Sequence, residues 1–169
     1  ERLRSERIEV YDGAGARVAE WPLERPGSLA LAPGGKTLYA VSGGGVAALD
    51  TASGEAIRLA LDVRRPDGLA CDGAGLLYVF DRDPERLNIR VFDPRSGAPV
   101  RTIGAPGGHR AGPWEPTRLT TGPHVAVALA VDADGRLWVV ENDFAGKRIS
   151  RWTTDGRFEK EFLGNPRYG

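Results

Sequence analysis

The chain has 169 residues and a formal net charge of zero, with 23 Lys or Arg residues and 23 Asp or Glu residues. Its length allows one domain with a sizeable core. The balanced charge lacks the basic excess of nucleic-acid-binding proteins, so a nucleic-acid partner is not expected. No run approaches the roughly 18 apolar residues of a membrane span. The 23 glycines and 12 prolines are typical of an all-β chain rich in turns.

One phrase, an apolar strand followed by a glycine turn and a second apolar strand, occurs three times. It begins at Leu29, Leu69 and Leu129, and the first two starts are 40 residues apart. The phrases read LALAPGGKTLYAV, LACDGAGLLYV and LAVDADGRLWV. A period of about 40 residues with short strands favours the repeated blades of a β-propeller. The second strand of each phrase is continuously apolar, which is typical of strands covered on both faces.

The predicted fold class is therefore all-β, a β-propeller of about three and a half blades, each complete blade having four antiparallel strands. In chain order we expect a half blade at 8–21, whole blades at 27–62, 67–104 and 125–164, and an inserted loop at 105–124. Propeller rings have about four to eight blades. Because the chain also contains no methionine, we interpret it as a piece of a longer protein whose remaining blades are its partners.

The repeats resemble NHL repeats, most clearly in PDGLACDGAGLLYV at 66–79 and VDADGRLWVVE at 131–141. The region from 112–116 through 147–152 to 168–169 is similar to a group of large bacterial exported NHL proteins of unassigned function. The resemblance implies a six-bladed propeller that serves as a binding platform and sometimes as an enzyme scaffold. It also implies an extracytoplasmic or secreted location.

A second resemblance concerns a metal. The segment RPDGLA at 65–70 resembles calcium-dependent lactonases of the gluconolactonase type, which implies that Asp67 binds Ca²⁺ or another divalent cation in a central channel. Calcium takes about six to eight oxygen ligands. The matching positions of the neighbouring repeats offer Gly27 and Val127, which supply no side-chain ligand. The alternative is that Asp67 and Gly68 form a tight turn at the entry to a strand, with no cofactor.

Polar residues follow the second strand of two successive repeats. Asp81 and Asp83 hold this place in one repeat, and Glu141, Asn142 and Asp143 hold it in the next. Matching positions in neighbouring blades predict that these side chains line one rim and face a ligand. The alternative is that they belong to two solvated loops.

The inserted loop 105–124 holds Trp114 and both histidines of the chain, His109 and His124. Loops of this length in compact domains are usually functional or disordered. Trp114 is a candidate anchor for a protein or carbohydrate ligand, with His109 beside it. In the alternative, Trp114 packs onto the blade and holds the loop in place. A zinc site needs more ligands than the two histidines provide.

These observations predict a non-catalytic binding or scaffold module of a larger bacterial protein. The alternative is a divalent-metal-dependent lactonase or hydrolase. Arg64, Arg65, Arg82 and Arg86 form a basic cluster, but acidic residues interleave with them, which disfavours nucleic-acid binding. The single cysteine, Cys71, is expected to be a small buried apolar residue.

Overall fold

The computed structural model describes residues 6–120, 127–143 and 146–165, which form strands, turns and loops. The first sheet contains β1 (Arg7–Tyr11) and β2 (Arg17–Pro22). The second sheet contains β3 (Leu29–Leu31), β4 (Thr37–Ser42), β5 (Gly45–Asp50) and β6 (Ala56–Arg58). The third contains β7 (Pro66–Cys71), β8 (Leu77–Asp81), β9 (Asn88–Phe92) and β10 (Pro99–Ile103). The fourth contains β11 (Val127–Val131), β12 (Arg136–Asp143), β13 (Gly146–Thr153) and β14 (Phe158–Leu163).

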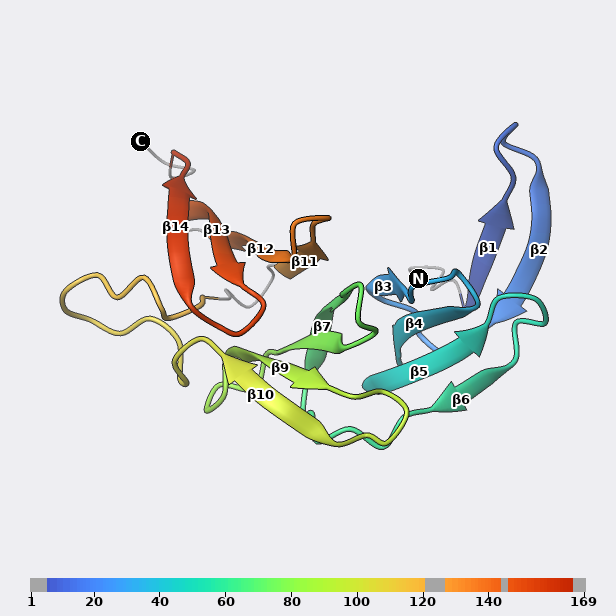
Figure 1. Cartoon of the computed structure of the whole chain (residues 1–169), viewed down its shortest axis with the longest axis horizontal. Helices are drawn as coiled ribbons and strands as arrows, with labels where there is room; N and C mark the ends of the chain where they lie inside the picture. Colours follow the sequence, from blue (N-terminus) through green and yellow to red (C-terminus); the bar gives the residue numbers. More distant parts are fainter. Residues whose placement is uncertain (1–5, 121–126, 144–145, 166–169) are drawn as a thin grey trace, which may run out of the picture.

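Within each sheet, consecutive strands pair antiparallel, so the first sheet is a hairpin and the three four-stranded sheets are meanders. The four sheets follow one another around an open arc, with β3, β7 and β11 on its inner side (Figure 1). Strands β3 and β11 both contact β7, which joins neighbouring sheets along that inner side. The predicted all-β class is confirmed. Within the described residues no helix is long or apolar enough to cross a membrane.

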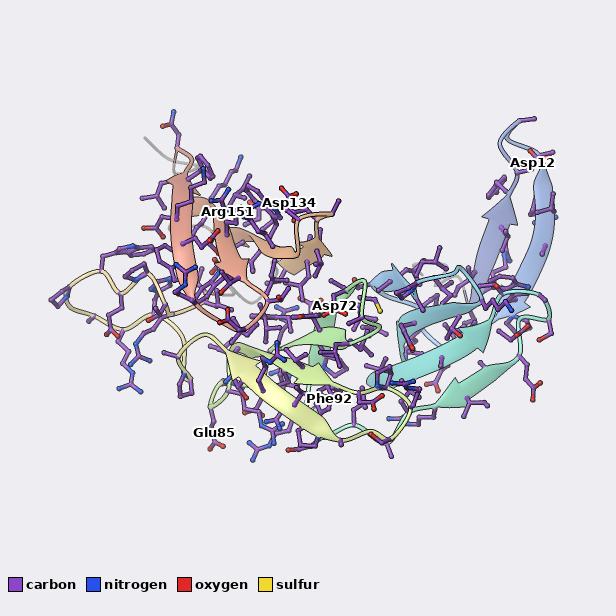
Figure 2. The ribbon with its side chains drawn as sticks, in the orientation of Figure 1. Asp12, Asp72, Glu85, Phe92, Asp134 and Arg151 are labelled. Atoms are coloured by element: carbon purple, nitrogen blue, oxygen red, sulfur yellow. The ribbon has the colours of Figure 1, made fainter. Side chains whose placement is uncertain are left out.

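Repeated turns set the length of the strands. Asp12, Asp72 and Asp132 each stand at the start of a turn, and Oδ1 of each accepts hydrogen bonds from the backbone N–H groups two and four residues later. This bonding is the usual reason for aspartate in tight turns. Figure 2 shows Asp12, Asp72 and Asp134 at the tips of three such hairpins.

Strand β8 is apolar and buried on both faces because the third sheet lies between the second and the fourth. Along β8, Leu77 and Val79 pack toward the second sheet, whereas Tyr78 and Phe80 pack toward the fourth. Successive side chains of a strand point to opposite faces, so a strand between two sheets requires apolar residues at every position. Cys71 packs beside the cluster between the second and third sheets, and burial raises the pKa of its thiol to about 11.

The outward faces of the two end sheets differ in chemistry. On the first sheet, Glu9 and Glu20 form ion pairs with Arg7 and Arg17 at 2.9–3.4 Å. On the fourth sheet, Val140, Ile149 and Phe162 are exposed. The Trp138 and Phe162 rings stack at a centroid distance of 6.4 Å on that side. One end of the arc therefore carries ion pairs, whereas the other carries an apolar row beside Arg151 and Lys160, whose cationic groups lie over Trp138 and Phe162.

Candidate functional site

The predicted rim residue Asp81 is a buried structural carboxylate. Its oxygens accept hydrogen bonds from the backbone N–H groups of Arg64 at 3.1 Å, Arg65 at 3.0 Å and Asp83 at 3.1 Å, and from Arg86 Nη1 at 3.0 Å. Burial opposes ionisation of Asp81, but these hydrogen bonds outweigh it, and the pKa of the carboxyl is lowered. Asp81 thereby fixes the segment that enters the third sheet.

Glu141 occupies the same position one sheet later. The β-pairing places Asp81 opposite Asn88 at the end of β8 and Glu141 opposite Arg148 near the end of β12. Glu141 is buried, and its Oε1 accepts a hydrogen bond from the backbone N–H of Thr120 at 2.6 Å. Both carboxylates therefore hold the connector, meaning the segment between the last strand of one sheet and the first strand of the next.

The remaining rim residues are placed differently. Asp83 accepts hydrogen bonds from the Glu85 N–H at 3.1 Å and from Arg64 Nη1 at 3.2 Å. Asn142 is exposed near the end of β12, and the Asp143 backbone pairs with Gly146. The Asp143 side chain and residues 144–145 lie outside the described residues. The rim interpretation of these three residues stays a prediction.

The inserted loop leaves β10 and folds back on itself. The Ala105 N–H donates to the Thr117 carbonyl at 2.8 Å, and Ala105 forms a parallel bridge with Arg118. Leu119 is fully buried in the core between the third and fourth sheets. The described part of the loop, 105–120, is therefore closed at its base and attached to the core. His124 lies outside the described residues.

Arg148, on β13, joins the loop to the fourth sheet. Its guanidinium donates to the Arg118 carbonyl at 2.9 Å and to the Pro116 carbonyl, and it forms ion pairs with Glu141 at 3.2 Å and Glu161 at 2.7 Å. The Arg148 side chain is only 2% exposed. A buried guanidinium needs such a set of acceptors, because an uncompensated buried charge costs several kcal/mol.

The Trp114 side chain contacts neighbouring side chains and is also exposed to solvent. Its ring stacks on His109 at a centroid distance of 4.3 Å, and the Arg148 guanidinium carbon lies over the ring at 5.4 Å. The indole Nε1 donates to Glu161 at 2.8 Å. Despite these contacts Trp114 is 52% exposed. The two alternatives considered for Trp114 therefore coexist in one side chain, which is held in place and still faces solvent.

Among the described residues, the partners of Asp67 are not metal ligands. Its Oδ2 accepts a 3.3 Å hydrogen bond from the backbone N–H of Val127 and lies 3.7 Å from Arg82 Nη1. An amide N–H and a guanidinium are partners for an anion and cannot ligate calcium. Among the residues that the structure describes, no group of three or more His, Cys, Asp and Glu could hold a metal ion. The described surroundings of Asp67 thus do not fit a divalent-metal site, and we derive no reaction through one.

Three of the four arginines in the basic cluster of the sequence, Arg64, Arg82 and Arg86, form ion pairs with carboxylates. Arg64 pairs with Asp83 and Glu85 at 3.2 and 2.8 Å. Asp62 accepts from Arg86 at 2.9 Å and from Arg90 at 2.8 Å, and the hydrogen bond from Arg86 is the main cause of the lowered pKa of Asp62. These guanidinium groups already form ion pairs with carboxylates of the same chain.

Comparisons with known proteins identify the fold alone. No protein-family model matches the chain, and no curated protein matches it. A hydrazine synthase chain from Kuenenia stuttgartiensis is similar at a TM-score of 0.66 and 16% identity, over 95% of this chain and 44% of that chain. A chain of a nidogen–laminin complex has the same TM-score and identity, over 95% and 58%. Virginiamycin B lyase from Staphylococcus aureus is similar at a TM-score of 0.59 and 16% identity, over 98% of this chain and 50% of that chain.

The predicted propeller is therefore confirmed. The four-stranded meanders and the β-propeller neighbours agree on a partial propeller, and the sheets described above are its blades. The chain spans about half the length of these solved chains.

Proposed function

We propose that this chain is a non-catalytic binding module and that the described part of the inserted loop, 105–120, forms its ligand surface. The observation that carries the proposal is the placement of Trp114, an indole held by three side chains and still half exposed. Tryptophan is enriched among residues that dominate binding energy, and a rigid anchor loses little conformational entropy when it binds. Arg110 and Glu115 are exposed on the same loop and supply polar groups at its rim.

A protein ligand is the favoured class. One similar solved chain comes from a nidogen–laminin complex, which supports a protein partner for a propeller of this shape. His109 stacks on one face of the Trp114 ring, which reduces the aromatic face available for a sugar ring. We further propose that the blades are of the NHL type, that the exposed face of the fourth sheet packs against a further blade of a bacterial parent protein, and that this protein is extracytoplasmic.

The test is a selection from a displayed peptide library on the immobilised chain, with counter-selection on Trp114→Ala. We expect enriched peptides that bind the unchanged chain with micromolar Kd and bind Trp114→Ala at least about tenfold more weakly. Trp138→Ala, which removes an indole from the outward face of the fourth sheet, is the matched control and should leave the Kd unchanged. Peptides that bind Trp114→Ala equally well contradict the proposed surface.

A parallel assay addresses the enzymatic alternative. The chain is incubated with Ca²⁺ and a panel of sugar lactones, and acid release is followed at constant pH. We expect no release above that of a protein-free sample. Release that Asp67→Asn abolishes would overturn the non-catalytic proposal.

A further inference from the structure

The first sheet has two strands where each of the other three has four. Strand β1 corresponds to β5, β9 and β13, because each of these strands pairs with the last strand of its sheet. On the other edge, β5, β9 and β13 pair with the second strand of their sheets, whereas β1 pairs with no further strand among the described residues. In Figure 1, β1 lies on the inner side of β2, toward β3. The first sheet therefore presents an open strand edge to the inner side of the arc.

The backbone of β1 has hydrogen-bonding groups at this open edge. The Leu23 N–H donates to the Glu6 carbonyl at 2.9 Å, at the start of the pairing between β1 and β2. Opposite residues in an antiparallel pair alternate between hydrogen-bonded and non-hydrogen-bonded positions. Arg7 and Glu9 are therefore at non-hydrogen-bonded positions and turn their N–H and C=O groups away from β2. Pro22, which has no N–H group, lies opposite Arg7, as this alternation allows.

Strand β3 exposes leucines at a position that the next sheet buries. Leu29 and Leu69 begin the same repeated phrase, but Leu69 is 2% exposed, whereas Leu29 is 46% and Leu31 is 56% exposed. Leu69 is buried because it packs against the second sheet. Leu29 pairs with Ala40, which packs against the first sheet, and residues paired across two strands lie on the same face. The two exposed leucines of β3 thus face the side where the first sheet has only two strands.

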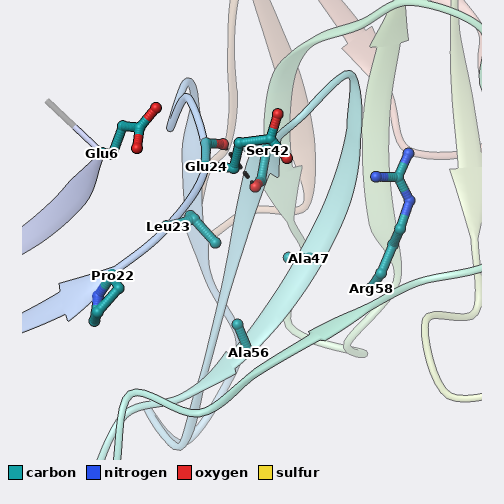
Figure 3. Close-up of a pocket in the computed structure, with 8 residues that line it drawn as sticks. All are labelled: Glu6, Pro22, Leu23, Glu24, Ser42, Ala47, Ala56 and Arg58. Carbon is teal, nitrogen blue, oxygen red and sulfur yellow. Dashed lines mark hydrogen bonds between the residues drawn. The ribbon is translucent and has the colours of Figure 1, made fainter. Parts of the chain in front are cut away.

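The first sheet is held firmly on the second. Leu23 and Ala47, both drawn in Figure 3, belong to the apolar cluster between these two sheets. Ser42 Oγ donates a hydrogen bond to the Glu24 carbonyl at 2.8 Å, which ties the segment between β2 and β3 to the end of β4 (Figure 3). The open edge of β1 and the leucines of β3 are thus fixed relative to each other, and a preformed surface loses little conformational entropy on binding.

We propose that this edge binds a β-hairpin of a partner protein, which adds two strands to the first sheet. One strand of the hairpin pairs with β1 through the backbone of Arg7 and Glu9, and the other covers Leu29 and Leu31. In such strand addition the backbone supplies affinity and the alternate side chains supply specificity. The hairpin is apolar toward β3 and polar on its other face, because the outward face of the first sheet carries the ion-paired Glu9 and Glu20.

A second copy of the chain does not fit this edge through its own β1. Paired residues of two antiparallel strands lie on the same face, so Ile8 of both copies would point to one side of the joined sheet. Ile8 packs there on the second sheet of its own copy, and the two second sheets would occupy the same space. This favours a hairpin of a different protein. The site does not depend on the function proposed for the inserted loop.

The probe is a synthetic peptide of residues 29–42, which form the β3–β4 hairpin of the chain itself. In the folded chain, Tyr39 and Val41 of this hairpin pack against the third sheet. The same two side chains give the peptide an apolar face for the exposed leucines of β3. Leu29→Thr and Leu31→Lys, made in the peptide alone, render its other face polar.

The experiment measures amide hydrogen exchange of the uniformly ¹⁵N-labelled full chain by NMR, with and without this peptide. We expect exchange at Arg7 and Glu9 to slow and to saturate with a Kd of about 100 μM or tighter. The physical reason is that these two N–H groups become donors to the added strand. A peptide that binds without slowing these amides contradicts strand addition.

Variants of the chain assign the apolar contact. Leu31→Lys should weaken peptide binding about tenfold, since a charge replaces an apolar side chain under the hairpin. Ile57→Lys is the matched control and should leave the Kd unchanged, because Ile57 is exposed on β6, at the opposite edge of the same sheet. An unaltered Kd in Leu31→Lys overturns the proposal. So do Arg7 and Glu9 amides that already exchange slowly without peptide, because the edge would then be covered by the chain itself.

Discussion

At the scale of single residues, the acidic positions at the strand ends hold the connectors. Asp81 is the last residue of β8 and Glu141 lies near the end of β12, and the sequence alone identifies them as matching positions. The role of these carboxylates was not predictable, because it depends on the backbone N–H groups of Arg64 and Thr120, which lie 17 and 21 residues earlier. A pattern along one chain does not show which amides a carboxylate reaches.

Asp81→Asn tests this role. The amide keeps one acceptor but turns an NH₂ group toward backbone donors, so we expect a loss of about 1–3 kcal/mol in the free energy of unfolding. The folded pKa of Asp81 is lowered, so its stabilisation is present at neutral pH and is lost as pH falls below the unfolded value of about 3.9. Urea unfolding at pH 7 and pH 3 measures both effects. A variant as stable as the unchanged chain at pH 7 contradicts this role.

Arg148 carries the second prediction at this scale. Arg148→Ala leaves the buried Glu141 without its cation, and we expect a loss of about 3–5 kcal/mol in the free energy of unfolding. Sequence reasoning missed Arg148, because an arginine in a strand is usually solvated. The feature that could have indicated this role is the position of Arg148 opposite Glu141 in the predicted strand pair. The control is Arg157→Ala, which removes an exposed guanidinium. If the two variants were equally stable in urea unfolding, Arg148 would not be the buried cation that compensates Glu141.

At the scale of elements, the sequence predicted the strands and their order well, because each sheet obeys two local rules. An apolar run on both faces indicates a strand between two sheets, and an Asp or Gly turn indicates its end. The path of residues 105–120 was not predictable in the same way. It is set by contacts with Arg148 and Glu161, which lie on the fourth sheet, far from the loop in sequence.

Gly54 tests how neighbouring sheets interlock. Gly54 has φ +75°, and a Cβ there would lie 2.1 Å from Trp21 Cδ1 of the first sheet. Gly15 has φ +83° with open space around it, so Gly15→Ala introduces the backbone strain alone. We expect Gly54→Ala to destabilise the chain by about 1–3 kcal/mol more than Gly15→Ala does. Thermal and urea unfolding of the two variants measure this difference. Equal losses in the free energy of unfolding would contradict close packing of Gly54 against Trp21.

At the scale of the whole molecule, the two end faces predict how the chain behaves in solution. The fourth sheet exposes Val140, Ile149 and Phe162, the kind of contiguous apolar surface that marks an interaction face. We expect concentration-dependent self-association in sedimentation velocity, reduced by Ile149→Lys. Val18→Lys places the same charge on the first sheet and should change nothing. A chain that stays monomeric at every concentration contradicts this expectation.

The propeller shape itself supports many functions, so the binding role rests on one local feature, the described inserted loop with Trp114. Amide hydrogen exchange of the unchanged chain, with and without a peptide enriched by the library selection, tests that role most directly. The account predicts slower exchange in 105–120 and unchanged exchange on β12–β14. Protection confined to β12–β14, with none in 105–120, would contradict it.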